Sequence, residues 1–312
     1  MSSPETDPDR LLRRLEWTVL RRLDGLFQGD YRSLFRGFGM DLADIREYEY
    51  GDDVRFIDWN VTARLATPYV RRFDEDREIT AWLVLDVSPS VDFGSGERKK
   101  LDLLVEFVAL VSRVLTRHGN RVGALIYDGV GKEVMPARGG RDQVLALLKL
   151  LMARPSLETA PPTDLRALLS SVLDMVKRRS LVLLVSDFFS EPTWAEPLSY
   201  LCLRHEVLAV RLSDPSEKEL PDAGITRIRD AETGEQFWVD THDRHFRERF
   251  AAAALHREEA LRASLAQAGV DALELSTGDD VAESILRFAE LRKGRARLSG
   301  GGAPATVFGR RS

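Results

Sequence analysis

Two uninterrupted apolar runs constrain the fold of this chain more than any other feature of its sequence. Residues 79–86 have the sequence ITAWLVLD, and residues 181–185 have the sequence LVLLV. Neither run alternates apolar with polar side chains, so both faces of each segment must be covered. Strands that are buried on both faces are typical of a parallel sheet with helices on each side. The two runs therefore predict central strands of an α/β domain.

The rest of the chain after residue 79 alternates between helical and strand-like periodicity. Strands that alternate with helices are joined by right-handed crossovers, so we expect a doubly wound, mostly parallel sheet. The expected helices are residues 101–115, 141–152, 164–176, 194–203, 243–268 and 280–292. The further expected strands are residues 122–127, 207–212 and 272–275, with a short edge strand at 133–135 and a hairpin of 225–228 with 236–239.

The flanking segments have a different character. Apolar residues recur at helical spacing over residues 11–27, which predicts an N-terminal amphipathic helix. Residues 29–76 are dense in charge, glycine and aromatics, and we expect an irregular, largely extended arm. The predicted organisation is a disordered N-terminus (1–10), the helix and arm (11–76), the α/β domain (77–293) and a disordered tail rich in Gly, Arg and Ser (294–312).

Composition excludes several classes of function. The formal net charge of −5 gives no global basic field for a nucleic-acid backbone. The single cysteine, Cys202, excludes an intrachain disulfide and a thiolate-rich zinc site. No apolar stretch is long enough for a membrane span, and the first ten residues lack the apolar core of a secretion signal. We therefore expect a cytoplasmic protein.

Oxygen-bearing side chains follow the two apolar runs. Asp86, Ser88 and Ser90 come directly after the first run, and Asp187 comes two residues after the second. Thr163 stands at the start of a predicted helix. In a doubly wound sheet, ligands bind outside the carboxyl ends of the strands, where the strand order reverses. We expect these five side chains to lie together at that edge.

Two carboxylates and three hydroxyls form a hard-oxygen set without His or Cys. Such a set suits Mg²⁺, with Mn²⁺ or Ca²⁺ as alternatives, and disfavours zinc. So few carboxylates leave positive charge on the ion, and an open coordination position would attract an acidic side chain from a protein partner. The pattern therefore predicts metal-dependent protein binding.

Other interpretations of the same residues remain open. Thr163 could be a helix N-cap, and Asp86 with its serines could form a simple Asx turn. The five residues would then only shape turns in a metal-free scaffold. A metal-dependent phosphoester hydrolase is a further alternative, because phosphatases of the haloacid dehalogenase type also place an Asp after the first strand. They require a second Asp two residues later, where this chain has Ser88.

Enzyme motifs are otherwise missing from the sequence. It contains no phosphate-binding P-loop and no Gly-x-Ser-x-Gly elbow of a serine hydrolase. The five histidines are scattered, without carboxylate or Cys neighbours at metal-site spacing. No complete catalytic constellation is found, so we expect a non-catalytic protein.

The pattern Asp86-x-Ser88-x-Ser90, then Thr163, then Asp187 resembles the metal-ion-dependent adhesion site of von Willebrand factor type A domains. The segment REYEYGDDVRFIDWN over residues 46–60, followed by Thr62-Ala63-Arg64, resembles the signature of the bacterial domain-of-unknown-function 58 family. Members of this family commonly accompany a MoxR-type AAA+ ATPase that acts on client complexes. The resemblance therefore implies such an ATPase as partner. One departure is Pro161-Pro162, where the family more often has glycine, and rigid prolines could displace Thr163 from the ion.

The signature arm has two possible roles: a docking surface for a partner, or an ion-paired clasp on its own domain. We favour the clasp, because dense charge of mixed sign usually satisfies itself. Burial of Trp59 and Tyr48 would then anchor the arm. The residues singled out on the arm are Arg46, Asp52, Asp53, Arg55, Asp58, Trp59 and Arg64.

Overall fold

A computed structural model describes residues 7–15, 45–49, 54, 57, 59–65, 67–71, 79–155, 161, 163–229, 235–298 and 306–307. Its centre is a seven-stranded sheet in the order β11-β10-β7-β6-β3-β4-β5. The strands are β3 (Thr80–Asp86), β4 (Arg121–Tyr127), β5 (Lys132–Arg138), β6 (Leu181–Ser186), β7 (Glu206–Ser213), β10 (Asp271–Ser276) and β11 (Thr306–Val307).

The sheet is doubly wound, as the sequence predicted. Neighbouring strands are parallel except β4 and β5, which pair antiparallel at one edge. From β3 the chain proceeds outward to β4 and β5, and then returns to place β6 on the other side of β3. The strand order therefore reverses between β3 and β6. Ligand sites of such sheets lie outside the carboxyl ends of the strands at this switch point.

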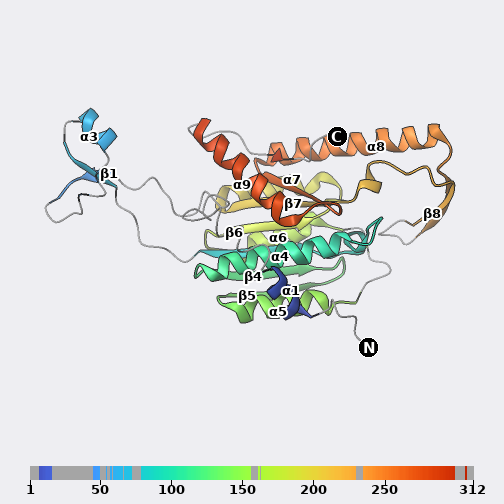
Figure 1. Cartoon of the computed structure of the whole chain (residues 1–312), viewed down its shortest axis with the longest axis horizontal. Coiled ribbons are helices and arrows are strands. Elements are labelled where there is room, and N and C mark those ends of the chain that lie inside the picture. Colours follow the sequence, from blue (N-terminus) through green and yellow to red (C-terminus); the bar gives the residue numbers. More distant parts are fainter. Residues whose placement is uncertain are drawn as a thin grey trace.

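Helices cover both faces of the sheet (Figure 1). One face packs against α1, α4, α5 and α9, and the other packs against α6, α7 and the C-terminal part of α8. The bounds of these helices are α1 (Pro8–Leu15), α4 (Lys100–Arg117), α5 (Arg141–Met152), α6 (Leu165–Met175), α7 (Ala195–Arg204), α8 (Arg244–Ala268) and α9 (Val281–Leu298). Three short 3₁₀ helices lie at η4 (Pro89–Asp92), η5 (Pro192–Trp194) and η6 (Pro215–Glu217).

The two apolar runs explain this layering. In β3, Leu83 and Leu85 join the core under α4, whereas Val84 joins the core under α6 and α7. In β6, Leu183 and Leu184 divide between the same two cores. Because successive side chains of a strand point to opposite faces, a run without polar residues requires a helical layer on each side.

The flanking segments differ from the prediction where the structure describes them. α1 begins at Pro8, inside the segment predicted to be disordered, and Leu12 is buried in the core with α4 and α5. Asp9 of α1 also accepts a 2.8 Å hydrogen bond from Arg141 of α5. The second half of the predicted helix, residues 16–27, lies outside the described residues.

The C-terminal prediction also needs correction. α9 continues to Leu298, and Thr306–Val307 form β11 at the edge of the sheet beside β10. The expectation of disorder from residue 294 onward is therefore wrong for these residues. Backbone pairing with an open sheet edge supplies the order that composition alone did not indicate.

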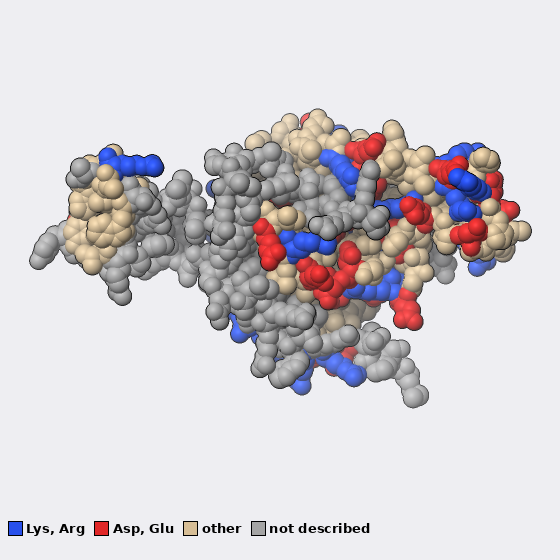
Figure 2. All heavy atoms as spheres, turned by 45° about the horizontal axis from the view of Figure 1, so that its top comes forward, with Lys and Arg blue, Asp and Glu red and all other residues tan. Residues whose placement is uncertain are grey.

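The predicted hairpin is present as β8 (Ile225–Arg229) and β9 (Gln236–Asp240), which pair antiparallel. It lies at the same end of the molecule as the first turns of α8, which extend past the sheet (Figure 1). On the described part of the face in Figure 2, acidic and basic side chains alternate, including those around this end. The surface charge there is mixed in sign.

We predict that Leu183→Ala in β6 lowers the free energy of unfolding by about 2–5 kcal/mol, because it opens a cavity at a fully buried position. Chemical denaturation followed by circular dichroism measures this loss. Leu203→Ala is the matched control, since Leu203 is 82% exposed and its truncation should change stability by less than about 0.5 kcal/mol. Equal losses in the two variants would contradict the assigned burial of β6.

Candidate metal and partner-binding site

Parallel pairing brings the first and last of the predicted ligands to one place. Leu85 of β3 lies opposite Val185 of β6, so Asp86 ends its strand beside Ser186 and next to the Asp187 loop. Asp86 and Asp187 are both buried. The two carboxylates therefore lie at the switch point of the sheet, where the sequence placed them.

The Asp86 loop is held by short-range hydrogen bonds. The backbone N–H of Ser88 donates to Oδ1 of Asp86 at 3.1 Å, which is an Asx turn. Ser88 and Ser90 are buried, with their hydroxyl oxygens 3.1 Å apart. The Ser186 hydroxyl donates to Oδ2 of Asp86 at 2.7 Å. The turn expected from the alternative interpretation exists, and it gathers the three oxygen-bearing side chains of the loop.

The Asp187 loop has an unusual backbone. Phe188 has φ 59°, in the left-handed region that bulky residues seldom adopt. Its N–H donates to the Ser186 hydroxyl at 3.0 Å, and its ring packs edge-on against Trp194 with centroids 5.2 Å apart. The N–H of Phe189 donates to Oδ1 of Asp187 at 3.1 Å. Ser186 thus ties the two loops together, and packing of Phe188 holds the turn that aims Asp187.

Thr163 lies beside the Asp187 loop. Thr163 is buried, and its backbone carbonyl accepts a 2.7 Å hydrogen bond from the hydroxyl of Ser190. The N-cap of α6 is Asp164, whose side chain accepts from the N–H of Ala167 at 2.9 Å. The alternative in which Thr163 caps this helix is therefore wrong.

The electrostatics of Asp86 favour a nearby cation. Burial, and secondarily the charge of Asp187, raise the pKa of Asp86 from its ordinary 3.8 to about 6, although hydrogen bonds from Ser186 and Ser88 oppose the shift. A divalent ion between the carboxylates would stabilise the ionised form of Asp86 and so oppose both effects. Within the described ranges, no group of three or more His, Cys, Asp or Glu side chains is placed to hold a metal ion. A cation here would depend on hydroxyl ligands beside the two carboxylates.

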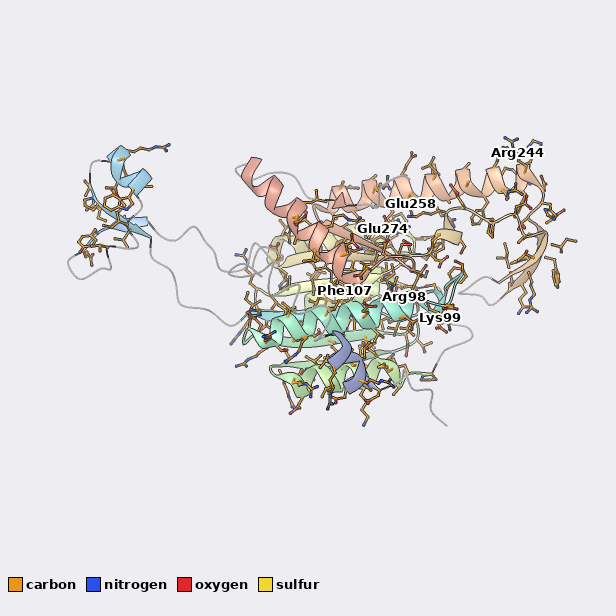
Figure 3. All side chains as sticks on the ribbon, viewed as in Figure 1. Arg98, Lys99, Phe107, Arg244, Glu258 and Glu274 are labelled. Carbon is orange, nitrogen blue, oxygen red and sulfur yellow. The ribbon has the colours of Figure 1, made fainter. Side chains whose placement is uncertain are left out.

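A buried ion pair that the sequence analysis missed lies behind Asp187. The ammonium of Lys100, at the start of α4, is 2.8 Å from Oδ2 of Asp187 and 2.6 Å from Oε1 of Glu217. The residues before it, Arg98 and Lys99, mark this end of α4 in Figure 3. The sequence contained a signal for this ion pair, because lysines are disfavoured at helix N-termini, where the helix dipole is positive. Lys99-Lys100 at such a position indicates a specific acidic partner.

Asp214, in the loop after β7, is a second missed residue. Its side chain accepts hydrogen bonds from the N–H of Ser95, from Ser216 and from the hydroxyl of Thr277. Burial acts against ionisation, but these bonds outweigh it and hold the pKa of Asp214 well below its usual range. Asp214 and Glu217 also form a capping box around η6, a spacing that is visible in the sequence. This fixed anion fastens the loops that follow β3, β7 and β10.

A cavity of about 210 Å³ opens on the α8 side of the Asp187 loop. Beneath it Arg211 of β7 forms ion pairs with Glu258 of α8 and Glu274 of β10, and Lys218 also contacts Glu274 at 2.6 Å. Figure 3 labels Glu258 and Glu274, which lie close together between α8 and the sheet. Asp187 thus lies between the buried Asp86 loop and a cluster of buried charges.

The signature arm does not form the expected clasp in its described part. β1 (Ile45–Glu47) pairs with β2 (Tyr69–Arg71), and α3 (Trp59–Leu65) packs beside β2. Figure 1 shows α3 and β1 apart from the sheet, on the opposite side of the molecule from β8.

Trp59 is 70% exposed, so the prediction that its burial anchors the arm is wrong. Short-range pairing replaces the extended conformation expected for these residues. Arg46 lies in β1 and Arg64 is an exposed residue of α3. Asp52, Asp53, Arg55 and Asp58 lie outside the described residues.

The fold and the site define an α/β domain with an oxygen-rich polar centre at the switch point of its sheet. Residues 44–260 match the family described as protein of unknown function DUF58. The chain belongs to this family, as the signature over residues 46–60 indicated. The match extends from the arm into α8 and includes all five predicted ligands.

Relatives in mycobacteria share most of the chain. An uncharacterized protein of Mycobacterium bovis is 38% identical over 292 residues, which cover 93% of this chain and 90% of the relative. A Mycobacterium tuberculosis protein gives the same values. A Mycobacterium avium protein is 35% identical over 169 residues, which cover 53% of this chain and 97% of the relative.

Solved structures with a partly similar chain path include one von Willebrand A domain. An aerotolerance-related membrane protein of Bacteroides fragilis gives a TM-score of 0.45 at 11% identity, covering 69% of this chain and 99% of that one. BatB of Bacteroides thetaiotaomicron gives 0.42 at 12% identity with the same coverage. The SpRpn10 VWA domain gives 0.38 at 8% identity, covering 67% and 94%. We infer no function from these likenesses. Among the described helices, none has the length and apolar character needed to cross a membrane.

We predict that Asp86→Asn raises the melting temperature in EDTA at pH 7. The pKa of Asp86 is raised to about 6 in the folded state, so ionising this carboxyl destabilises the native protein above that pH, by an amount on the order of a few kcal/mol. The difference in melting temperature between the variant and the wild type should shrink as the pH falls from about 6 towards 4, because Asp86 of the folded wild type is then protonated. Thermal melts between pH 4 and 8 measure it, with the exposed Asp174→Asn as control. A pH-independent difference would contradict the assignment.

Proposed function

We propose that this chain is a non-catalytic, metal-dependent protein-binding adaptor. Mg²⁺, or Mn²⁺ or Ca²⁺ in its place, would be held by Asp86, Ser88, Ser90, Thr163 and Asp187, and would present an open coordination position. An acidic side chain of a protein partner would fill that position. The expected partner is a MoxR-type AAA+ ATPase, with which the adaptor would act on client protein complexes.

The observation that carries this proposal is the meeting of Asp86 and Asp187 at neighbouring strand ends with serine hydroxyls around them. Both carboxylates are buried, and the charge of Asp187 contributes to the raised pKa of Asp86. Buried like charges are unfavourable unless a cation or a proton intervenes. Lys100 supplies a positive charge to Asp187 but shares it with Glu217, and the hydrogen bonds to Asp86 come from neutral groups. Carboxylate and hydroxyl oxygens are suitable ligands for hard divalent ions.

The surroundings of the site favour binding over hydrolysis. A hydrolase requires a group that can accept or deliver a proton at the reacting atom. Lys100, the basic side chain that contacts Asp187, lies between Asp187 and Glu217; burial would lower its pKa, but these two carboxylates outweigh burial and hold the pKa above its usual range. The position two residues after Asp86, which carries the second Asp in haloacid dehalogenase phosphatases, is Ser88. A phosphoester hydrolase is therefore the weaker alternative.

The choice of partner rests on family membership and on the electrostatics of the ion. Few carboxylate ligands would leave a bound divalent ion with positive charge, which favours an acidic ligand over a neutral one. The signature arm, with Trp59 exposed on α3, lies away from the site and would offer the ATPase or a client a second contact.

Mg²⁺ or Mn²⁺ should raise the melting temperature of the wild-type protein. A ligand that binds only the native state stabilises it by about 2.7 kcal/mol at a hundredfold excess over its dissociation constant. Asp86→Ala should abolish this rise, whereas Asp174→Ala, which removes an exposed carboxylate from α6, should retain it. Identical melts with Mg²⁺ and with EDTA would instead support a metal-free scaffold.

The adaptor should also capture its ATPase in a Mg²⁺-dependent way. Immobilised wild-type protein is expected to retain a MoxR-type ATPase from the same cell in Mg²⁺ but not in EDTA, and Asp86→Ala should lose this capture while keeping its circular dichroism spectrum. Undiminished capture in EDTA would refute the metal-bridged mechanism. Turnover of generic phosphoesters that requires both Mg²⁺ and Asp86 would favour the hydrolase.

A further inference from the structure

Lys100 occupies a position where a lysine is doubly unfavourable. Its side chain is 1% exposed, which makes it one of the largest fully buried side chains of the protein. It is also the first residue of α4, where the helix dipole repels a positive charge. Burying an ammonium costs several kcal/mol unless specific partners compensate it. The location of Lys100 therefore depends on its contacts.

The contacts of Lys100 enclose its ammonium. Oδ2 of Asp187 and Oε1 of Glu217 accept hydrogen bonds from it at 2.8 and 2.6 Å. The rings of Phe93 and Phe189 lie with their centroids 5.7 and 5.2 Å from it. Glu217 is itself fixed, because its Oε2 accepts a 3.0 Å hydrogen bond from the N–H of Asp214. The ammonium is thus held between two carboxylates from different loops.

This arrangement makes the two carboxylates of the candidate site unequal. The oxygens of Asp86 accept hydrogen bonds from neutral groups, the N–H of Ser88 and the hydroxyl of Ser186. Asp187 accepts one from the neutral N–H of Phe189 and a second from a full positive charge. The charge of Asp187 is therefore partly offset by Lys100, which Glu217 shares, whereas the contacts of Asp86 come from neutral donors.

We infer that Lys100 is a built-in counter-ion of the metal site: it positions Asp187 and offsets part of its charge, so that a bound divalent ion keeps more of its positive charge. This inference rests on the proposed function and deepens it, because it names the residue that sets how strongly the ion attracts an acidic partner. Lys100 acts through Asp187 and is a positioning residue. Its effect is to weaken the cation's own affinity for the site and to strengthen the recruitment of an anionic ligand.

Direct titration of Mn²⁺, followed by electron paramagnetic resonance of the free ion, tests the inference on the full chain. Lys100→Met removes a positive charge close to the ion and should tighten Mn²⁺ binding by roughly tenfold or more. Lys99→Met is the matched control, because Lys99 is half exposed, precedes Lys100 in the chain and pairs with Asp92. It should leave Mn²⁺ affinity within about twofold, since an exposed charge is screened by solvent.

Glu217→Gln provides a second variant of opposite sign, which keeps the ammonium buried even if Lys100→Met fails to fold. Removing the Glu217 carboxylate leaves the full charge of Lys100 on Asp187, so Mn²⁺ binding should weaken severalfold. If Lys100 had only a structural role, both variants would be less stable than the wild type, but their affinities for Mn²⁺ would not change in opposite directions. Circular dichroism and thermal melts of each variant establish that it is folded.

The outcomes separate this inference from the proposed function. Tighter Mn²⁺ binding by Lys100→Met, or weaker binding by Glu217→Gln where Lys100→Met does not fold, supports the inference. Unchanged or reversed affinities, with Mn²⁺ bound by the wild type, overturn it and leave the metal-dependent adaptor standing. Binding by Lys100→Met but not by the wild type overturns the adaptor and retains Lys100 as the site's cation. No binding by any folded variant overturns both.

Discussion

The parallel pairing of β3 with β6 is the constraint on which the rest of this structure depends. It places two strands that are far apart in the sequence side by side, with Leu85 opposite Val185. Their carboxyl ends therefore deliver Asp86 and Asp187 to one point, although about a hundred residues separate them. Because the strand order reverses between these strands, the helices that follow them cover opposite faces of the sheet, and ligand sites of such sheets lie at this point. The apolar runs that fill both cores thus also create the polar site.

Buried charge is organised around that point. Ser186 connects the two loops by donating to Asp86 and accepting from the N–H of Phe188. Behind Asp187, Lys100 links α4 to η6 through Glu217, and Asp214 fastens the Ser95 and Thr277 loops. The contacts of Asp86 with Ser186, of Lys100 with Glu217 and of Asp214 with Ser95 and Thr277 join segments from different parts of the chain. The site is therefore part of the framework of the domain.

The sequence predicted the layers and most element boundaries, because periodicity and apolar runs report local geometry and burial directly. It also placed Asp86, Ser88, Ser90 and Asp187 at one sheet edge, since the rule for doubly wound sheets depends only on strand type. It could not give the burial of Lys100, because that depends on carboxylates from two distant loops. For the same reason it misjudged Trp59, whose exposure depends on where the arm packs, and the end of the chain at β11, which is ordered by a neighbouring strand.

The span of the Lys100 contacts has a consequence for biosynthesis. Asp187 and Glu217 follow Lys100 by 87 and 117 residues, so neither is available when α4 first leaves the ribosome. Burying the ammonium in an interior without water is unfavourable until these carboxylates are present. α4 therefore cannot pack fully against the sheet until β6, β7 and η6 have been synthesised. Until then the nascent chain lacks the complete site formed by the Asp86 and Asp187 loops. A partner that binds this site would therefore bind only chains that have been synthesised beyond η6.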